Sequence, residues 1–263
     1  MTNQTNAAWS DLANGATNVR AWWALAWDDL RSRYQRTILG PFWVTLSHAA
    51  AVGGLAIWSS LLMKQPLADA FLYVAAGLTV WALISTSLIE ASSTFIRAAA
   101  FISAYDLPIA LQVFRIVTGQ VLAFAHNMIV FLVAVAYVGH VPTLTTLLAI
   151  PGLLLLILVC ISWTFCLGVA GARFRDIAPL ISSVVGMLMI LTPVFWRKND
   201  IVGAEWLAQA NPLYHLLQIV RAPLLGQLPA PENWYVSLTI LMVSGIAAVV
   251  IFTQNRRHLA YWL

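Results

Sequence analysis

Six long apolar runs without a charged residue constrain this chain more than any other feature of its sequence. A helix needs about 20 apolar residues to cross the hydrocarbon core of a bilayer, and each run is close to that length or longer. Because backbone groups in lipid must form their hydrogen bonds internally, we expect every run to be a helix. The expected spans are 41–63, 70–89, 116–138, 147–170, 177–196 and 235–254.

The composition excludes a water-soluble fold. Charged residues make up 9% of the 263 residues, and the mean hydropathy is +0.82. Soluble domains carry roughly 25% charged residues, and a soluble chain of this length could not bury so much apolar surface. We therefore expect an all-α membrane protein in which residues 1–263 form a single transmembrane domain.

The basic residues predict how the chain crosses the membrane. Loops on one side of the expected spans hold ten arginines, and the other side holds four basic residues. Basic residues concentrate in cytoplasmic loops, so we expect both termini in the cytoplasm. The polar first 20 residues lack the apolar core of a signal peptide, so the first span is expected to remain as an anchor.

The segment 206–228 is apolar but is interrupted by Asn211, Pro212, Arg221 and Pro223. If it crossed the membrane, the basic C-terminal residues would lie on the outer side, against the charge bias. We expect instead two short re-entrant helices between the fifth and sixth spans. Such helices are tolerated where protein or water covers their backbone.

Two amphipathic segments are expected outside the spans. Residues 18–37 place tryptophans such as Trp22 and Trp27 on one face and end in basic residues, which is typical of a helix at the membrane surface. Residues 96–105 form a second, shorter helix that Pro108 brings to an end. The first segment is either a surface anchor or a docking site for a partner, and the second is either a lever for a soluble partner or a connector.

Several kinds of chemistry are missing from the sequence. Neither lysine follows a glycine, so the chain has no phosphate-binding loop of the Walker A type, and any ATP and Mg²⁺ would belong to a partner subunit. The five histidines lack metal-ligand spacing, and no carboxylate lies in the middle of a span. We therefore do not expect this chain to be an enzyme or an ion-coupled carrier. We also expect no metal site and no cofactor on it. The arginines stand in short clusters between apolar runs, which argues against binding of nucleic acid.

Aromatic residues are abundant at the ends of the first and fifth spans. Sugar rings stack on aromatic faces through their apolar surface, so these residues could line a path for a sugar chain. The alternative is an aromatic belt that faces lipid. The candidate path residues are Phe42, Trp43, Trp58, Phe195 and Trp196.

Five short motifs, taken together, resemble those of ABC-2 type polysaccharide export permeases, the transmembrane subunits of ABC exporters for O-antigens, capsules and teichoic acids. They follow the order of that family from about residue 20 to the end of the chain. Asp28 departs from the family, which usually has arginine at this position. The motifs are Asp29–Trp43, Arg173–Ile177, Thr192–Trp196, Asn211–Leu213 and Leu259–Leu263.

The resemblance implies a location in a bacterial inner (plasma) membrane, an assembly and a substrate. Two copies of the chain would form a homodimer with a channel between them, and two copies of a P-loop ATPase subunit would dock beneath it. The substrate would be a polysaccharide on a polyprenyl diphosphate lipid, and spans one and five would line its path. The helices within 201–228 would cap the channel exit.

The resemblance also assigns roles to individual residues. The segment 18–37 would be the interface helix, which contacts the ATPase through Trp22 and Trp27. The stretch from Arg97 to Tyr105 would be the coupling helix, which contacts it through Arg97, Phe101 and Tyr105. The lipid diphosphate would be met by three arginines, whose alternative role is control of topology. These are Arg31, Arg33 and Arg36.

Two other functions remain open at this point. An ABC-2 permease for drugs or small lipids would share the architecture but should lack the arginine-rich motif before the first span and the C-terminal Tyr-Trp-Leu. A membrane scaffold or lipid-processing protein would need no ATPase. An enzyme of the latter kind should show a catalytic polar cluster within the spans, and the sequence shows none.

Overall fold

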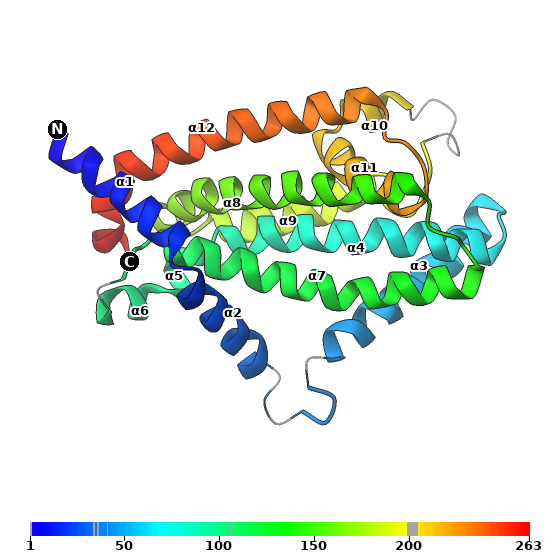
Figure 1. Ribbon diagram of the computed structural model, residues 1–263, viewed down its shortest axis with the longest axis horizontal. Coiled ribbons are helices and arrows are strands. Elements are labelled where there is room, and N and C mark those ends of the chain that lie inside the picture. Colours follow the sequence, from blue (N-terminus) through cyan, green and yellow to red (C-terminus); the bar gives the residue numbers. More distant parts are fainter. Residues whose placement is uncertain (1, 34, 36, 41, 106, 199–204) are drawn as a thin grey trace.

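The computed structural model describes residues 2–33, 35, 37–40, 42–105, 107–198 and 205–263. In this part of the chain every regular element is a helix, as the apolar runs predict. The helices form one elongated bundle with both termini at the same end (Figure 1). The elements are α1 (Thr2–Thr17), α2 (Val19–Arg33), α3 (Phe42–Met63), α4 (Leu67–Ala91), α5 (Thr94–Arg97), α6 (Ala99–Ala104), α7 (Leu111–Val138), η1 (Leu144–Leu148), α8 (Ala149–Arg173), α9 (Ile177–Leu191), α10 (Glu205–Ala210), α11 (Pro212–Leu224) and α12 (Pro231–Trp262).

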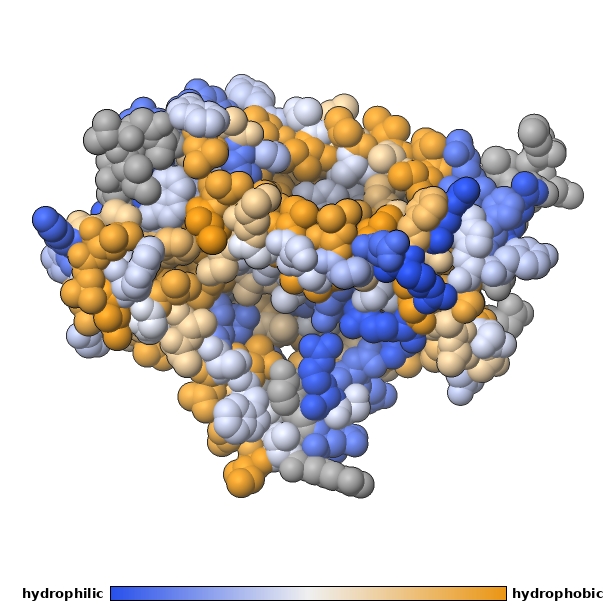
Figure 2. All heavy atoms as spheres, turned by 180° about the vertical axis from the view of Figure 1, so that it is seen from behind, coloured by the Kyte–Doolittle hydropathy of each residue, from blue (hydrophilic) through white to orange (hydrophobic). Residues whose placement is uncertain are grey.

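Five helices are long and apolar enough to cross a membrane, at 22 to 30 residues each. They are α3, α4, α7, the continuous unit of η1 with α8, and α12. In this order they cover the first, second, third, fourth and sixth expected spans. Hydrophobic residues cover the middle of the face in Figure 2, while hydrophilic residues gather toward the end that holds the termini. The chain is therefore a multi-pass helical membrane protein.

Helix α9 is shorter than the expected fifth span. It has 15 residues and ends at Leu191, whereas the apolar run continues to Trp196. The cause is Pro193, which disfavours a helical conformation in the residue before it, and Thr192 is accordingly extended. At a rise of 1.5 Å per residue, α9 is about 22 Å long, which is less than the ~30 Å core of a bilayer.

Helix α4 lies at the centre of the bundle. In its most apolar 18-residue window 61% of the residues are buried, against 17% to 33% in the other four long helices. It contacts α3, α7, α8, α9 and α11. Small residues permit these close approaches: Gly77 lies directly against the backbone of Val194, where a larger side chain would not fit. The other long helices bury one face and leave the other free for lipid.

Helices α10 and α11 follow the end of α9 and occupy the expected place of two short helices. The side chain of Asn211 caps α11 by accepting a hydrogen bond from the backbone N–H of Leu213 at 3.0 Å, and Pro212 takes the first helical position. The amide nitrogen of Asn211 also donates to the hydroxyl of Thr192 at 2.8 Å. Most of α11 is buried against α4, α8, α12 and η1.

The N-terminal segment contains a helix that the polar composition of the first 20 residues does not predict. Helix α1 packs against α7 and α12, and α2 packs against α7. Asp11 on α1 is buried and accepts hydrogen bonds from the backbone N–H groups of Ile109 and Ala110, at the start of α7. It also pairs with Arg256 on α12 at 2.6 Å. One carboxylate thus joins three helices near the chain termini.

Candidate functional site

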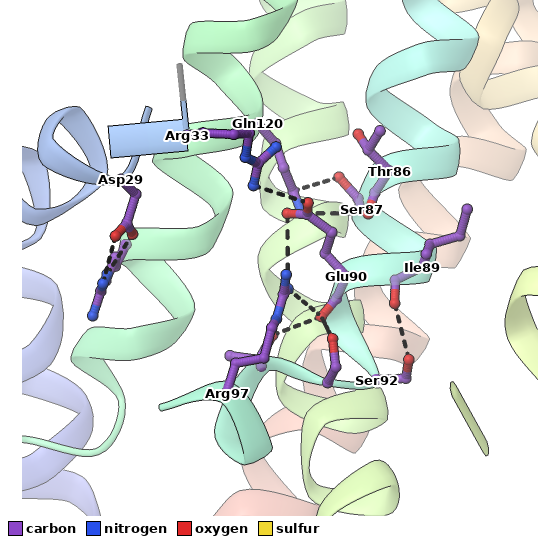
Figure 3. A network of polar contacts seen from close by, with 12 residues as sticks. Asp29, Arg33, Thr86, Ser87, Ile89, Glu90, Ser92, Arg97 and Gln120 are labelled. Carbon is purple, nitrogen blue, oxygen red and sulfur yellow. Dashed lines mark hydrogen bonds and ion pairs between the residues drawn. The ribbon is translucent and has the colours of Figure 1, made fainter. Parts of the chain in front are cut away.

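A polar cleft lies between α2, α4, α5 and α7, at the end of the bundle that holds the termini. Two adjoining hollows of about 260 and 180 Å³ make up the cleft, and both are lined by Asp29, Arg33 and Arg115. Arg97 lines the first hollow and Glu90 the second. We call these five residues the arginine cleft, and Figure 3 shows the polar contacts around Asp29, Arg33, Glu90 and Arg97.

Asp29 and Arg115 join α2 to α7. The Nε and Nη2 atoms of Arg115 each donate to one carboxylate oxygen of Asp29, and both distances are 2.6 Å. This two-point geometry is the strongest pairing available to a guanidinium group. The Nη1 atom of Arg115 donates to the side chain of Gln112 at 3.2 Å. Helix α2 is therefore fixed to α7 by a directed ion pair, in addition to apolar packing.

Glu90 stands near the C-terminal end of α4 and receives contacts from three other helices. Its carboxylate lies 3.5 Å from Arg33 on α2 and 3.9 Å from Arg97 on α5. The amide of Gln120 on α7 donates to the same carboxylate at 3.5 Å. Ser87, one turn before Glu90, donates to Gln120 at 2.7 Å and holds it in place. The central helix is thus coupled to both α2 and α5 through one side chain.

The cleft has an excess of positive charge, since three arginines face two carboxylates. The pairs of Glu90 are long, and the side chains of Arg33 and Arg97 are 59% and 44% exposed. Such exposed pairs contribute little stability and exchange readily with other partners. Arginine recognises phosphate oxygens through paired donors, so the cleft can bind an anionic group such as a phosphate.

The three arginines expected to meet a lipid diphosphate are not brought together. Arg33 lies in the cleft, Arg31 is exposed on α2 outside the cleft lining, and Arg36 lies outside the described residues. The structure adds Arg97 and Arg115 to Arg33 instead. Charge clusters in the sequence could not reveal this set, because its members come from separate helices.

The residues expected to dock an ATPase fall into two groups. Trp22 stacks on Phe114 of α7, with ring centroids 6.4 Å apart, whereas Trp27 is exposed. The rings of Phe101 and Tyr105 pack at a tilt with centroids 4.8 Å apart, and the guanidinium group of Arg115 lies over the Phe101 ring at 5.4 Å. Helix α6 and its C-terminal cap therefore carry an aromatic pair next to the arginine cleft.

The candidate path residues do not form one continuous surface. Phe42, Trp43 and Trp58 are exposed on α3, whereas Phe195 and Trp196 are buried in the turn after α9. The two groups meet where Trp58 packs edge-on against Phe195 at 5.5 Å. The backbone carbonyls of the buried pair are also bound: Ser59 donates to Phe195 at 2.7 Å, and Tyr73 donates to Trp196 at 3.1 Å.

The fold and the cleft define a multi-pass helical membrane protein with a cationic cleft at one end of its bundle. The chain belongs to the ABC-2 type transporter family, which matches residues 20–225. This confirms the family that the sequence motifs indicate. Proteins of this family are membrane components of transporters and are not themselves catalytic, and in ABC exporters they work with ATPase subunits.

A named relative extends over nearly the whole chain. The O-antigen export system permease protein RfbA of Myxococcus xanthus is 21% identical over 236 residues. The aligned part covers 88% of this chain and 91% of that protein.

Proposed function

We propose that this chain is the transmembrane permease subunit of an ATP-driven exporter of lipid-linked polysaccharide. The substrate class is an O-antigen type glycan, moved from the cytoplasmic to the outer face of a bacterial inner membrane. The observation that carries the proposal is the similarity to an O-antigen export permease over 88% of the chain. The motifs of the polysaccharide-exporting permeases support the same substrate class.

The proposed topology has six spans and two cytoplasmic termini. Helix α9 with the turn that follows it is the fifth span, and α10 with α11 re-enters the membrane from the outer face without crossing it. The apolar character of α9 and the polar breaks at Asn211 and Arg221 support this arrangement. The arginine cleft then faces the cytoplasm, in agreement with the distribution of basic residues.

The proposed assembly is a homodimer bound to two copies of a P-loop ATPase, which holds ATP and Mg²⁺. A large part of α3 and α9 is not covered by this chain, and it includes the exposed residues Phe42, Trp43 and Trp58. A second copy and lipid would cover this surface, and the glycan would pass along it. Phe195 and Trp196 would then support Trp58 from behind rather than meet sugars directly.

The arginine cleft supplies the proposed link between ATP hydrolysis and transport. The ATPase would dock on α2 and on α5 with α6, where Trp27, Phe101 and Tyr105 offer aromatic contacts. Arg33 and Arg97 connect these helices to Glu90. A movement of either helix would therefore be transmitted to α4 at the centre of the bundle. The arginines would also meet the lipid diphosphate at the cytoplasmic leaflet.

Charged substitutions in the aromatic pair test the coupling. We expect Phe101→Glu combined with Tyr105→Glu to reduce export by at least about tenfold. A tenfold loss of binding affinity corresponds to ~1.4 kcal/mol, and burying an unpaired charge at a docking interface costs more than that. Glycan at the cell surface is measured with an antibody on intact and permeabilised cells. ATP hydrolysis is measured on purified complexes.

The matched control is Tyr105→Phe, which keeps the ring and should export normally. Deleting the gene should confine the glycan to the cytoplasmic face, where the antibody reaches it only after permeabilisation. Normal surface glycan in the deletion strain would contradict the proposed substrate. Normal export by the doubly charged variant would contradict docking at α6 while leaving the substrate class intact.

A further inference from the structure

A second polar pocket lies at the opposite end of the bundle from the arginine cleft. It has a volume of about 440 Å³, which is within the range of small-ligand sites. Its lining comes from α4, α11, the residue that follows the C-cap of α7, and the turn after α9. The residues that the inference uses are Tyr73, His140, Arg197, Lys198, Gln218 and Arg221. We call them the distal pocket.

Arg221 is the most constrained residue of the distal pocket. It is 1% exposed, and its Nη1 atom donates to the backbone carbonyl of Pro193 at 2.5 Å. Its Nε atom donates to Gln218 at 3.3 Å, and Gln218 in turn donates to the hydroxyl of Tyr214 at 2.9 Å. These bonds fix the guanidinium plane in advance of ligand binding.

Part of this fixed guanidinium group has no partner. The Nη2 atom of Arg221 is buried and makes no hydrogen bond to any described residue. His140 also lines the pocket, and its Nε2 atom is likewise buried without a hydrogen bond to any described residue. Buried polar atoms are normally satisfied, and Nη2 of Arg221 can only donate, so this atom indicates a missing acceptor, while Nε2 of His140 can donate or accept according to its tautomer.

Further positive charge surrounds the same place. The guanidinium groups of Arg221 and Arg197 lie 4.5 and 4.9 Å from the centre of one ring, that of Tyr73. Lys198 adds a third cation, and Asp69 is the carboxylate among the described lining residues. Asp69 makes no ion pair with Arg221, since none of the ion pairs among described residues involves either side chain.

The electrostatic balance of Arg221 favours an anion. Burial is the largest influence and lowers the pKa of its guanidinium group; Tyr73 and Tyr214 act in the opposite direction, and the charge of Arg197 lowers the pKa further. An arginine side chain nevertheless stays protonated in proteins, so the charge remains and is poorly solvated. A bound anion would offset both the burial and the repulsion between the two arginines.

We propose that the distal pocket binds a phosphate group, with Arg221 as the fixed donor and Arg197 and Lys198 as further cations. Arginine pairs two donors with two phosphate oxygens, and the free Nη2 atom supplies the donor that internal bonds leave unused. The group belongs either to a lipid headgroup or to a free phosphate. The inference goes beyond the proposed export function and does not depend on which molecule is transported.

Binding to the purified full-length chain tests the proposal without any export assay. The chain is placed in nanodiscs of phosphatidylcholine, and two probes are used: inorganic diphosphate, followed by calorimetry, and phosphatidylglycerol, followed by native mass spectrometry. We expect the double variant Arg197→Gln and Lys198→Gln to lower the affinity for at least one probe by about tenfold or more, because charge-assisted hydrogen bonds are lost.

Matched variants separate this pocket from other cationic sites. Lys64→Gln removes one charge from a residue in the turn between α3 and α4, outside the pocket, and should bind as the unmodified chain does. Lys198→Gln, which removes the same charge inside the pocket, should bind more weakly. Arg221→Lys keeps the charge but loses the paired donors, and its melting temperature is measured to check that it folds.

The two probes identify the source of the phosphate. A loss confined to phosphatidylglycerol indicates a lipid headgroup, and a loss for diphosphate indicates a free phosphate. The proposal is overturned if neither probe binds, or if Lys198→Gln and Lys64→Gln bind alike. It is also overturned if binding is lost only when Arg33 and Arg97 of the arginine cleft are changed to glutamine.

Discussion

At the scale of single residues, glycine positions decide how closely the helices approach. A Cβ atom added to Gly171 on α8 would overlap the backbone carbonyl of Ser92, which lies between α4 and α5. Gly152 at the other end of α8 is placed in the same way against the backbone of Ile219 on α11. Backbone oxygen atoms cannot move aside as flexible side chains do, so these sites admit glycine alone.

Gly171→Ala should therefore destabilise the fold. Overpacking a closely packed contact costs about 1–3 kcal/mol, and the melting temperature of the purified chain, followed by tryptophan fluorescence, should fall accordingly. The control is Gly245→Ala on α12, where the nearest atom to an added Cβ is 3.8 Å away. That change should leave the melting temperature unchanged or raise it, because alanine favours helix over glycine. Equal melting temperatures for the two variants would refute the close contact.

Some residues of the arginine cleft can be predicted from the sequence, and others cannot. Clustered charge is enough to mark Arg33 as a candidate, because it stands with Arg31 and Arg36 before the first span, whereas Arg97 is an isolated basic residue in its loop. The pairing of Asp29 with Arg115 joins residues 86 positions apart and leaves no periodic signal. The distal pocket is harder still, since its central arginine lies in an apolar helix whose burial depends on the packing of four other elements.

At the scale of elements, hydropathy predicts the long helices, and local chemistry decides where they end. The positions of α3, α4, α7, α8 and α12 follow from apolar runs. Helix α9 stops short of its run because Pro193 follows, which hydropathy alone ignores. Hydropathy does not predict helix α1, because its composition is polar. This helix is held by the ion pair of Asp11 and by two hydrogen bonds from backbone N–H groups to the same carboxylate.

Asp11→Asn should accordingly release α1 from α7 and α12. The side chain of Asp11 is 1% exposed, and neutralising its carboxylate leaves Arg256 without its ion-pair partner. Breaking a buried pair in this way costs about 3–5 kcal/mol, and somewhat less here because Arg256 is 33% exposed. Hydrogen exchange of the first 17 residues should become faster, with a lower melting temperature.

Asp28→Asn is the matched control for this change. Asp28 is exposed on α2 and makes none of the ion pairs among the described residues, so its neutralisation should leave exchange and melting unchanged. If Asp11→Asn behaved in the same way, the ion pair would contribute nothing to the docking of α1.

At the scale of the whole molecule, the bundle has two polar ends with different properties. The arginine cleft is open, and its ion pairs are partly exposed and suited to movement. The distal pocket is built around one buried and fixed arginine. Helix α4 runs between them, with Glu90 near one end and Tyr73 near the other. An ATPase acting on the first end could thus influence the second through one continuous helix.

If this chain depends on a separate ATPase, the two proteins should copurify, so its partners can be identified and counted. The tagged chain is purified gently from its native membrane, and the copurifying proteins are identified and counted by mass spectrometry. We expect a P-loop ATPase at one copy per permease chain. A chain that is purified alone, under conditions that keep a known ABC exporter intact, would show that it does not depend on such a subunit.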